Sequence, residues 1–167
     1  PTKVVTSTER RDLLPGAERV FRLLDLKPEG VEVRLNRCAE PCTYTADRNA
    51  LERVLSNVLK NAVLYGNGGP IDINLACSDE GGLIEIKDRG PGIPPAQLNA
   101  VFEPFYRLET HGNSTIPGSG LGLAIARQLA RKHGWKIELL PREGGGTIAR
   151  ILLPPSQQSE PAARTAA

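Results

Sequence analysis

Hydrophobic residues recur at every third or fourth position in three stretches of the chain, which is the spacing of one buried face of an α-helix. The three stretches are residues 8–27, 47–65 and 121–133. The second is followed by the glycine-rich segment 66–70 and the third by Gly134, and both are typical helix ends. The pattern therefore predicts three amphipathic helices.

Apolar and polar residues alternate in shorter stretches, as they do in half-buried β-strands. The predicted strands are residues 31–35, 71–76, 83–87, 136–140 and 147–153, with Tyr44 in a further short strand after the first. Turn-forming residues join the second strand to the third and the fourth to the fifth, which predicts two antiparallel hairpins. Helices interspersed with hairpins favour an α+β fold: a two-layer α/β sandwich with three helices on one face of a mixed, mostly antiparallel sheet.

The segment from Asp88 to Gly120 interrupts this regular pattern with many turn residues and little periodicity. A short stretch near 95–101 is the one part of it that favours a helical turn. A loop of this length inside a compact domain usually has a function. Residues with a binding or catalytic role are therefore expected in this loop and beside it.

Composition limits the classes of protein to consider. A chain of 167 residues and 18.0 kDa fits one domain, and 40% hydrophobic with 24% charged residues is ordinary for a globular protein. The net charge of +2 is too small to indicate a general nucleic-acid or anionic-membrane binder. If the protein binds phosphate, it must do so at a local site and not through its overall charge.

The termini and the cysteines add further expectations. No apolar run is long enough to cross a bilayer, and the N-terminus does not resemble a signal peptide. The absence of methionine suggests an excised fragment. Cys38, Cys42 and Cys77 lack zinc-site spacing and are interpreted as reduced thiols of a cytoplasmic protein, with a Cys38–Cys42 disulfide as the lesser alternative.

Asn57 and Asn61 are the first candidate pair. They are four residues apart on the second predicted helix, so they point in directions about 40° apart, beside the apolar stripe. Two side-chain carbonyls aimed into one cavity suit a magnesium ion whose remaining ligands are water and substrate phosphate. Taken alone, the pair fits ordinary surface or capping amides at least as well.

Two glycine-rich segments lie at the ends of predicted elements. DRGPGIP at 88–94 follows a strand and fixes the Asp88 carboxylate, which can accept a hydrogen bond from an amine such as the adenine amino group. GSGLGLAIAR at 118–127 opens a helix with free backbone amides, as a phosphate site does. The alternatives are a plain Gly/Pro turn for the first and close packing for the second.

The segment VFEPFYR at 101–107 concentrates aromatic residues beside an arginine. For Phe102, Phe105 and Tyr106 a hydrophobic plug that holds the loop against the core is favoured. Arg107 is different, because a guanidinium beside a phosphate loop is a natural partner for a terminal phosphate.

Together these segments resemble the catalytic, ATP-binding domain of the sensor histidine kinases of two-component signalling, members of the Bergerat-fold (GHKL) ATPases. The stretch NAVLYGNGGP at 61–70 resembles the osmosensing kinases in particular. The likeness covers about residues 9–154 and includes an asparagine box (55–62), two glycine boxes, a phenylalanine box and a closing GGGTIARILLP. Residues 1–8 would then be a linker remnant and residues 155–167 a disordered tail.

The resemblance implies roles for the two asparagines. Asn61 matches the asparagine that chelates magnesium between the phosphates. Asn57 matches its partner one turn earlier, where related ATPases such as gyrase and the heat-shock chaperones have a glutamate general base. Because a carboxamide is not a base, Asn57 fits an enzyme that delivers phosphate to another nucleophile rather than activating water.

The resemblance also implies the rest of a nucleotide site. Asp88 matches the adenine-reading aspartate, and Arg107 matches a phosphate-contacting arginine that acts with the two asparagines in catalysis. Residues 108–119 correspond to a mobile lid. The remaining residues expected to contact the nucleotide are Tyr65, Gly90, Gly92, Ile93, Gly118, Gly120, Leu121, Gly122 and Thr147.

The chain departs from the family pattern at Leu64, where many members carry a lysine or arginine that contacts phosphate. Lys60 is a candidate substitute, but it points about 100° away from Asn61 around the helix, so the sequence does not favour it. The family's phosphoacceptor histidine has no counterpart here. His111 in the lid and His133 at a helix end are interpreted as structural or incidental.

The resemblance implies an ATP- and magnesium-binding transferase module that presents phosphate to a histidine on a separate dimerisation domain, for transfer to a response regulator. The resemblance also implies that the parent is a homodimer and an inner-membrane receptor with a cytoplasmic kinase end. Because dimerisation in this family belongs to the separate domain, the fragment itself is expected to be a monomer. The alternatives are a non-catalytic, nucleotide-binding regulatory domain and an ATP-hydrolysing or serine-kinase member of the same fold. No nucleic-acid partner is expected.

Overall fold

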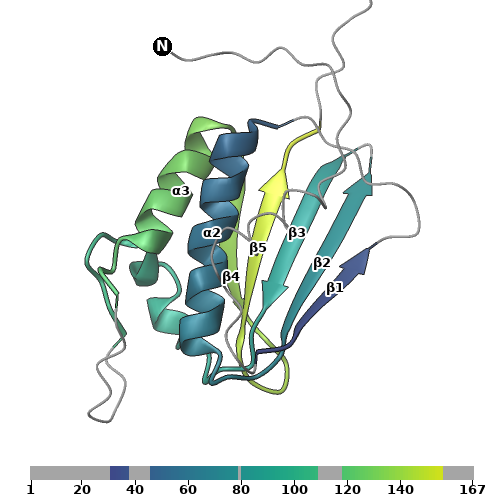
Figure 1. The fold of residues 1–167 in the computed structure, drawn as a ribbon. Coiled ribbons are helices and arrows are strands. Elements are labelled where there is room, and N and C mark those ends of the chain that lie inside the picture. The colour runs from purple at the N-terminus through teal and green to yellow at the C-terminus, as the bar shows by residue number, and fades with distance from the viewer. Residues whose placement is uncertain (1–30, 38–45, 79, 109–117, 156–167) are drawn as a thin grey trace, which may run out of the picture.

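The computed structural model describes residues 31–37, 46–78, 80–108 and 118–155. Several predictions fall outside these ranges: the first helix, the strand at Tyr44, the linker, most of the tail and of the lid, and the side chains of the three cysteines. The described residues hold two α-helices and a five-stranded sheet (Figure 1).

The sheet is mixed, as predicted. Its strands stand in the order β1-β2-β3-β5-β4. The only parallel pair among the described strands is β1 with β2, while β2–β3, β3–β5 and β4–β5 are antiparallel, so both predicted hairpins are confirmed. The bounds are β1 Val33–Arg37, β2 Ile71–Ser78, β3 Gly81–Lys87, β4 Lys136–Pro141 and β5 Thr147–Leu153.

The helices α2 (Arg48–Tyr65) and α3 (Gly122–Lys132) confirm two of the three predicted helices. α2 starts at Asp47, whose side chain accepts a hydrogen bond from the Ala50 N–H at 2.8 Å and so caps the helix. The two helices pack against each other and lie on the same side of the sheet (Figure 1). The predicted two-layer arrangement is thus confirmed for the described helices.

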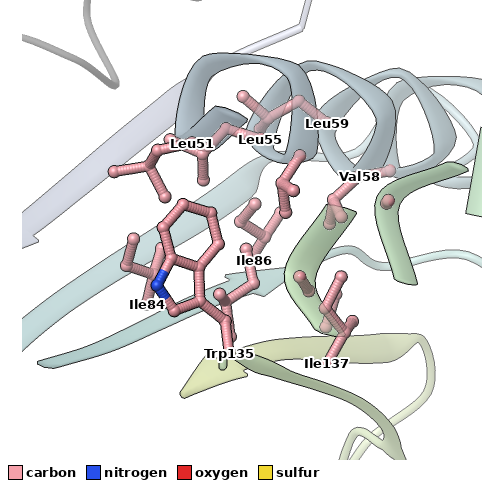
Figure 2. Packing of buried hydrophobic residues seen from close by; sticks show 14 of the residues in the cluster. Leu51, Leu55, Val58, Leu59, Ile84, Ile86, Trp135 and Ile137 are labelled. Atoms are coloured by element: carbon pink, nitrogen blue, oxygen red, sulfur yellow. The ribbon is translucent and has the colours of Figure 1, made fainter. Parts of the chain in front are cut away.

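One hydrophobic core lies between these layers. Figure 2 shows Leu55 and Leu59 of α2 above Ile84 and Ile86 of β3, with Trp135 between the helix and the sheet. Side chains as buried as these each contribute about 1.5–3 kcal/mol to folding. The core therefore fixes the position of α2 over the sheet, and with it the polar side chains that α2 carries at its edge.

The first strand differs from the prediction of a half-buried alternating strand. Val33 is 37% exposed although its neighbour in the sheet, Ile71, is fully buried. β1 is one of the two edge strands of the described sheet, the one far from α2 and α3 (Figure 1). An apolar side chain on the inner face is buried only where another layer covers it, so alternation alone did not predict this exposure.

The segment after β3 contains two short 3-10 turns, Pro95–Gln97 and Ala100–Phe102, where one short helical stretch was predicted. Val101 and Phe102 at its end are buried in the core. This attachment holds the otherwise irregular loop beside α2 and α3.

Candidate functional site

A cavity of about 300 Å³ lies beside α2, between the loop that follows β3 and the segment that leads into α3. Every predicted site residue except Gly90 and Leu121 lines it. The structure thus gathers into one cavity the residues that the motifs had placed far apart in the chain: Asn57, Asn61, Tyr65, Asp88, Gly92, Ile93, Arg107, Gly118, Gly120, Gly122 and Thr147.

Asp88 follows directly after β3 and is buried, with 8% of its surface exposed. Its Oδ1 accepts hydrogen bonds from the backbone N–H of Gly90 at 2.9 Å and of Thr147 at 3.1 Å. No described residue donates to Oδ2, so this oxygen is available to a donor in the cavity. Burial raises the pKa of the Asp88 carboxyl above its ordinary value, against the opposing effect of the two N–H donors and of Arg142.

The backbone beside Asp88 leaves no room for a side chain at position 90. A Cβ on Gly90 would lie 1.9 Å from the carbonyl oxygen of Tyr65 at the end of α2. Gly90 therefore does not line the cavity but lets the loop pass against α2. Tyr65 and Ile93 both line the cavity, as predicted.

Asn57 faces the start of α3. Its Nδ2 donates to the carbonyl oxygen of Arg53 at 3.0 Å, one turn earlier in α2. Its Oδ1 lies 3.4 Å from the position that a Cβ on Gly122 would occupy. The carboxamide oxygen thus lies where the glycine-rich segment becomes a helix.

Asn61 lines the cavity one turn further along α2. Its carboxamide forms no hydrogen bond within the described part of the chain. A partnerless amide beside a cavity has an oxygen available to a ligand. No group of three or more His, Cys, Asp or Glu side chains able to hold a metal occurs among the described residues.

The glycine-rich segment 118–122 forms the wall of the cavity at the start of α3. Gly120 has φ +72°, and a Cβ there would lie 3.0 Å from the backbone of Phe105. Gly122 is the first residue of α3, whose first N–H groups have no partner within the helix. Leu121 occupies the N-cap position of α3, without a capping hydrogen bond from its side chain, and does not line the cavity. Ser119, which the sequence did not single out, does line it. The sequence feature that could have identified Ser119 as a site residue is its position inside the glycine-rich motif at 118–127.

The aromatic cluster at 101–107 only partly forms the predicted plug. Phe102 is buried and Tyr106 packs against the core, but Phe105 is 72% exposed. Phe105 has φ +63°, and its N–H donates to the carbonyl oxygen of Gly120 at 3.0 Å. This turn directs its side chain away from the core, so the prediction was wrong for Phe105. Arg107 lines the cavity as expected.

Leu64, where the chain departs from the family pattern, lies at the cavity, and so does its candidate substitute Lys60. Leu64 is 40% exposed and lines the cavity. Lys60, which the sequence did not favour, lines it as well. The helical wheel compared the direction of Lys60 with that of Asn61 alone. The cavity wall also includes Asn57, so pointing away from Asn61 does not exclude Lys60 from the cavity.

His133 ends α3 and stacks on Trp135, with 4.9 Å between the ring centroids. It does not line the cavity. This agrees with the structural role expected for it, and His111 lies outside the described residues.

Comparison with known proteins decides the family. Residues 46–157 match the model of the histidine kinase-, DNA gyrase B- and HSP90-like ATPases. The chain belongs to this family. It is 39% identical over 132 residues to the sensor protein CutS of Streptomyces coelicolor, covering 78% of this chain and 31% of CutS.

Two further proteins support this kinase branch of the ATPase family. The chain is 37% identical to the sensor protein KdpD of Escherichia coli over 157 residues, which are 91% of this chain and 17% of KdpD. The structure of the mycobacterial sensor histidine kinase MprB superimposes with a TM-score of 0.74 at 32% identity, covering 89% of this chain and 97% of that one. This ATPase-family chain corresponds to the ATP-binding catalytic domain of a two-component sensor kinase.

The chain spans less than a third of the length of these two curated relatives. None of the helices described for this ATPase domain has the length and apolar character required to cross a membrane.

Proposed function

We propose that this domain binds Mg-ATP in the cavity and presents the γ-phosphate to a histidine on a separate dimerisation domain of its parent kinase. The phosphoryl group would leave ADP and bond to an imidazole nitrogen, and would later pass to an aspartate of a response regulator. The observation that carries this proposal is one cavity that has a buried carboxylate at one end and glycine backbone at the start of α3 at the other.

The carboxylate end suits adenine. Asp88 is held by two backbone donors at Oδ1, and Oδ2 is left for an amino group. Tyr65 and Ile93 provide apolar surface for a planar base. A rigid acceptor that discriminates an amino group from a carbonyl is what selective adenine binding needs.

The glycine end suits the phosphates. The first amides of α3 and the positive end of its dipole attract negative charge, and Arg107 adds a full positive charge to the cavity wall. Asn61, with Asn57 beside it, would hold the magnesium ion together with phosphate oxygens, since carboxamide oxygens are suitable ligands for this ion. The ion would supply charge neutralisation on the phosphates.

Asn57 favours phosphotransfer over hydrolysis. Its amide nitrogen is engaged with Arg53, and a carboxamide cannot take a proton from water. Catalysis by this domain would therefore consist of positioning the γ-phosphate and stabilising its charge. We further propose a membrane-anchored, homodimeric parent with this domain on the cytoplasmic side, because sensor proteins are among its relatives.

Replacement of Asn61 by Asp in the full-length kinase tests the proposal. The added negative charge beside the phosphates should abolish ATP-dependent phosphohistidine, measured with ATP labelled at the γ-phosphate. Asn99→Asp, which makes the same chemical change at an exposed position away from the cavity, should leave it unchanged. Normal phosphorylation of the Asn61→Asp protein would contradict the proposal.

A second candidate is a nucleotide-binding regulatory domain without kinase activity. Leu64 favours it, because an exposed apolar side chain at the cavity contributes no attraction for phosphate. Calorimetric titration with a non-hydrolysable ATP analogue, with and without magnesium, followed by the phosphohistidine assay, separates the two. Binding without phosphohistidine would favour the regulatory domain.

A further inference from the structure

We infer that Lys60 is the second cationic contact to the polyphosphate chain in this cavity, beside Arg107. The inference deepens the proposed function and rests on it. Apart from tyrosines, the ionisable side chains among the described residues that line the cavity are Lys60, Asp88 and Arg107. Asp88 is the negative one, so any attraction of phosphate by charged side chains of the described wall must come from Lys60 and Arg107.

The position of Lys60 on α2 places it at the phosphate end. It is three residues after Asn57, which is less than one helical turn and an axial rise of about 4.5 Å. Asn57 itself faces Gly122 at the start of α3. The carboxylate end lies further along the helix, where Gly90 passes the carbonyl oxygen of Tyr65. Lys60 is therefore nearer the glycine-rich segment than the adenine-binding end.

Lys60 and Leu64 are neighbours on one face of α2, because residues four apart on a helix lie one above the other. Both line the cavity and both are exposed. The wall at this point is thus made by one apolar and one cationic side chain. A lysine one turn away can supply the charge that leucine does not.

The Lys60 ammonium group is available for this role. No described residue forms a hydrogen bond or an ion pair with it. Lysine carries a compact charge on a flexible stem, which lets it follow a phosphate chain without a fixed geometry. The triphosphate of ATP carries more negative charge than one divalent cation neutralises, so two cationic side chains are a reasonable complement.

Titration of Lys60→Gln tests the inference. We would measure the dissociation constants of a non-hydrolysable ATP analogue with magnesium and of adenosine, which has no phosphate, for this chain and its variant. Loss of one charge-assisted contact should weaken analogue binding about tenfold. Adenosine affinity and the thermal midpoint should stay unchanged, because Lys60 is exposed. Lys132→Gln, the same change at the far end of α3, is the matched control and should bind the analogue normally.

A second variant sharpens the result. Leu64→Lys in the Lys60→Gln background returns a cation to the same face of α2 and should restore most of the lost affinity. Equal binding of the analogue by the original chain and Lys60→Gln would overturn the inference while leaving the proposed nucleotide site intact. Equal weakening of analogue and adenosine would also overturn it, since the effect would then be structural. If the original chain binds no nucleotide, the proposed function fails and the inference fails with it.

Discussion

Asp88 and Thr147 are joined by two hydrogen bonds that run in opposite directions. The Asp88 N–H donates to the Thr147 carbonyl oxygen at 3.0 Å, and the Thr147 N–H donates to Asp88 Oδ1 at 3.1 Å. One bond continues the backbone pairing of β3 with β5, and the other fixes the carboxylate. The side chain that we assign to base recognition is thus anchored to a strand 59 residues away in sequence.

Asp88→Asn should change the preference of the site for the base. The amide oxygen can still accept from Gly90 and Thr147, so the fold should be kept, but an NH₂ group replaces Oδ2. Two donors would then face each other when adenine binds, at a cost of about 1–3 kcal/mol, which is about a fivefold to 150-fold loss of affinity. The hypoxanthine nucleotide, which has a carbonyl in place of the amino group, should bind the variant better than adenine nucleotide does. Calorimetry with both nucleotides measures this, and unchanged adenine preference would contradict it.

The raised pKa of Asp88 predicts a pH dependence of stability. Folding raises this pKa above its ordinary value of 3.8, so folding favours the protonated form. The stability that Asp88 contributes is therefore full below the ordinary value and is lost as pH rises through the folded pKa. The amide of the Asp88→Asn variant does not titrate. The free energy of unfolding of this variant relative to the original chain should therefore increase with pH in this acidic window and be level near neutrality. Urea denaturation at several pH values checks it, and a difference independent of pH would contradict it.

Gly90→Ala should destabilise the domain, because the new Cβ would overlap the Tyr65 carbonyl oxygen unless the backbone moves. The expected loss is about 1–3 kcal/mol from overpacking, measured by urea denaturation. Gly134→Ala is the matched control. It has φ +72° but open space around its Cβ, so it reports backbone strain alone. If Gly90→Ala costs no more than Gly134→Ala, the close approach of the loop to α2 is not important for stability.

Arg127 should stabilise the loop that carries Arg107. Its guanidinium lies 4.8 Å from the centre of the buried Phe102 ring, and it pairs with Glu103 at 3.1 Å. Arg127→Gln should cost about 1 kcal/mol of unfolding free energy, mainly through the lost cation–π contact. Glu103→Gln should cost less than about 0.5 kcal/mol, since this carboxylate is 63% exposed. Urea denaturation of both variants measures the two losses, and an equal loss would show that the ion pair dominates instead.

Much of the local structure was predictable from the sequence. The 3.6-residue period predicted α2 and α3, whose apolar faces form the core, and alternation with turn residues predicted both hairpins. These patterns are local, so a short window of sequence contains them. The glycine-rich segments were also visible in the sequence as breaks in the regular pattern, but the contact that requires Gly90, with the Tyr65 carbonyl oxygen, was found only in the structure.

Other features depend on contacts between distant parts of the chain. The exposure of Val33 follows from the place of β1 at the sheet edge, and that of Phe105 from a turn that is bonded to Gly120. Lys60 was not favoured on a helical wheel, which contains no information on what packs beside the helix. The sequence by itself determined the elements and the residue types able to recognise a nucleotide. The tertiary structure alone decided which of them share a cavity, because a cavity wall is formed by elements whose packing no local pattern encodes.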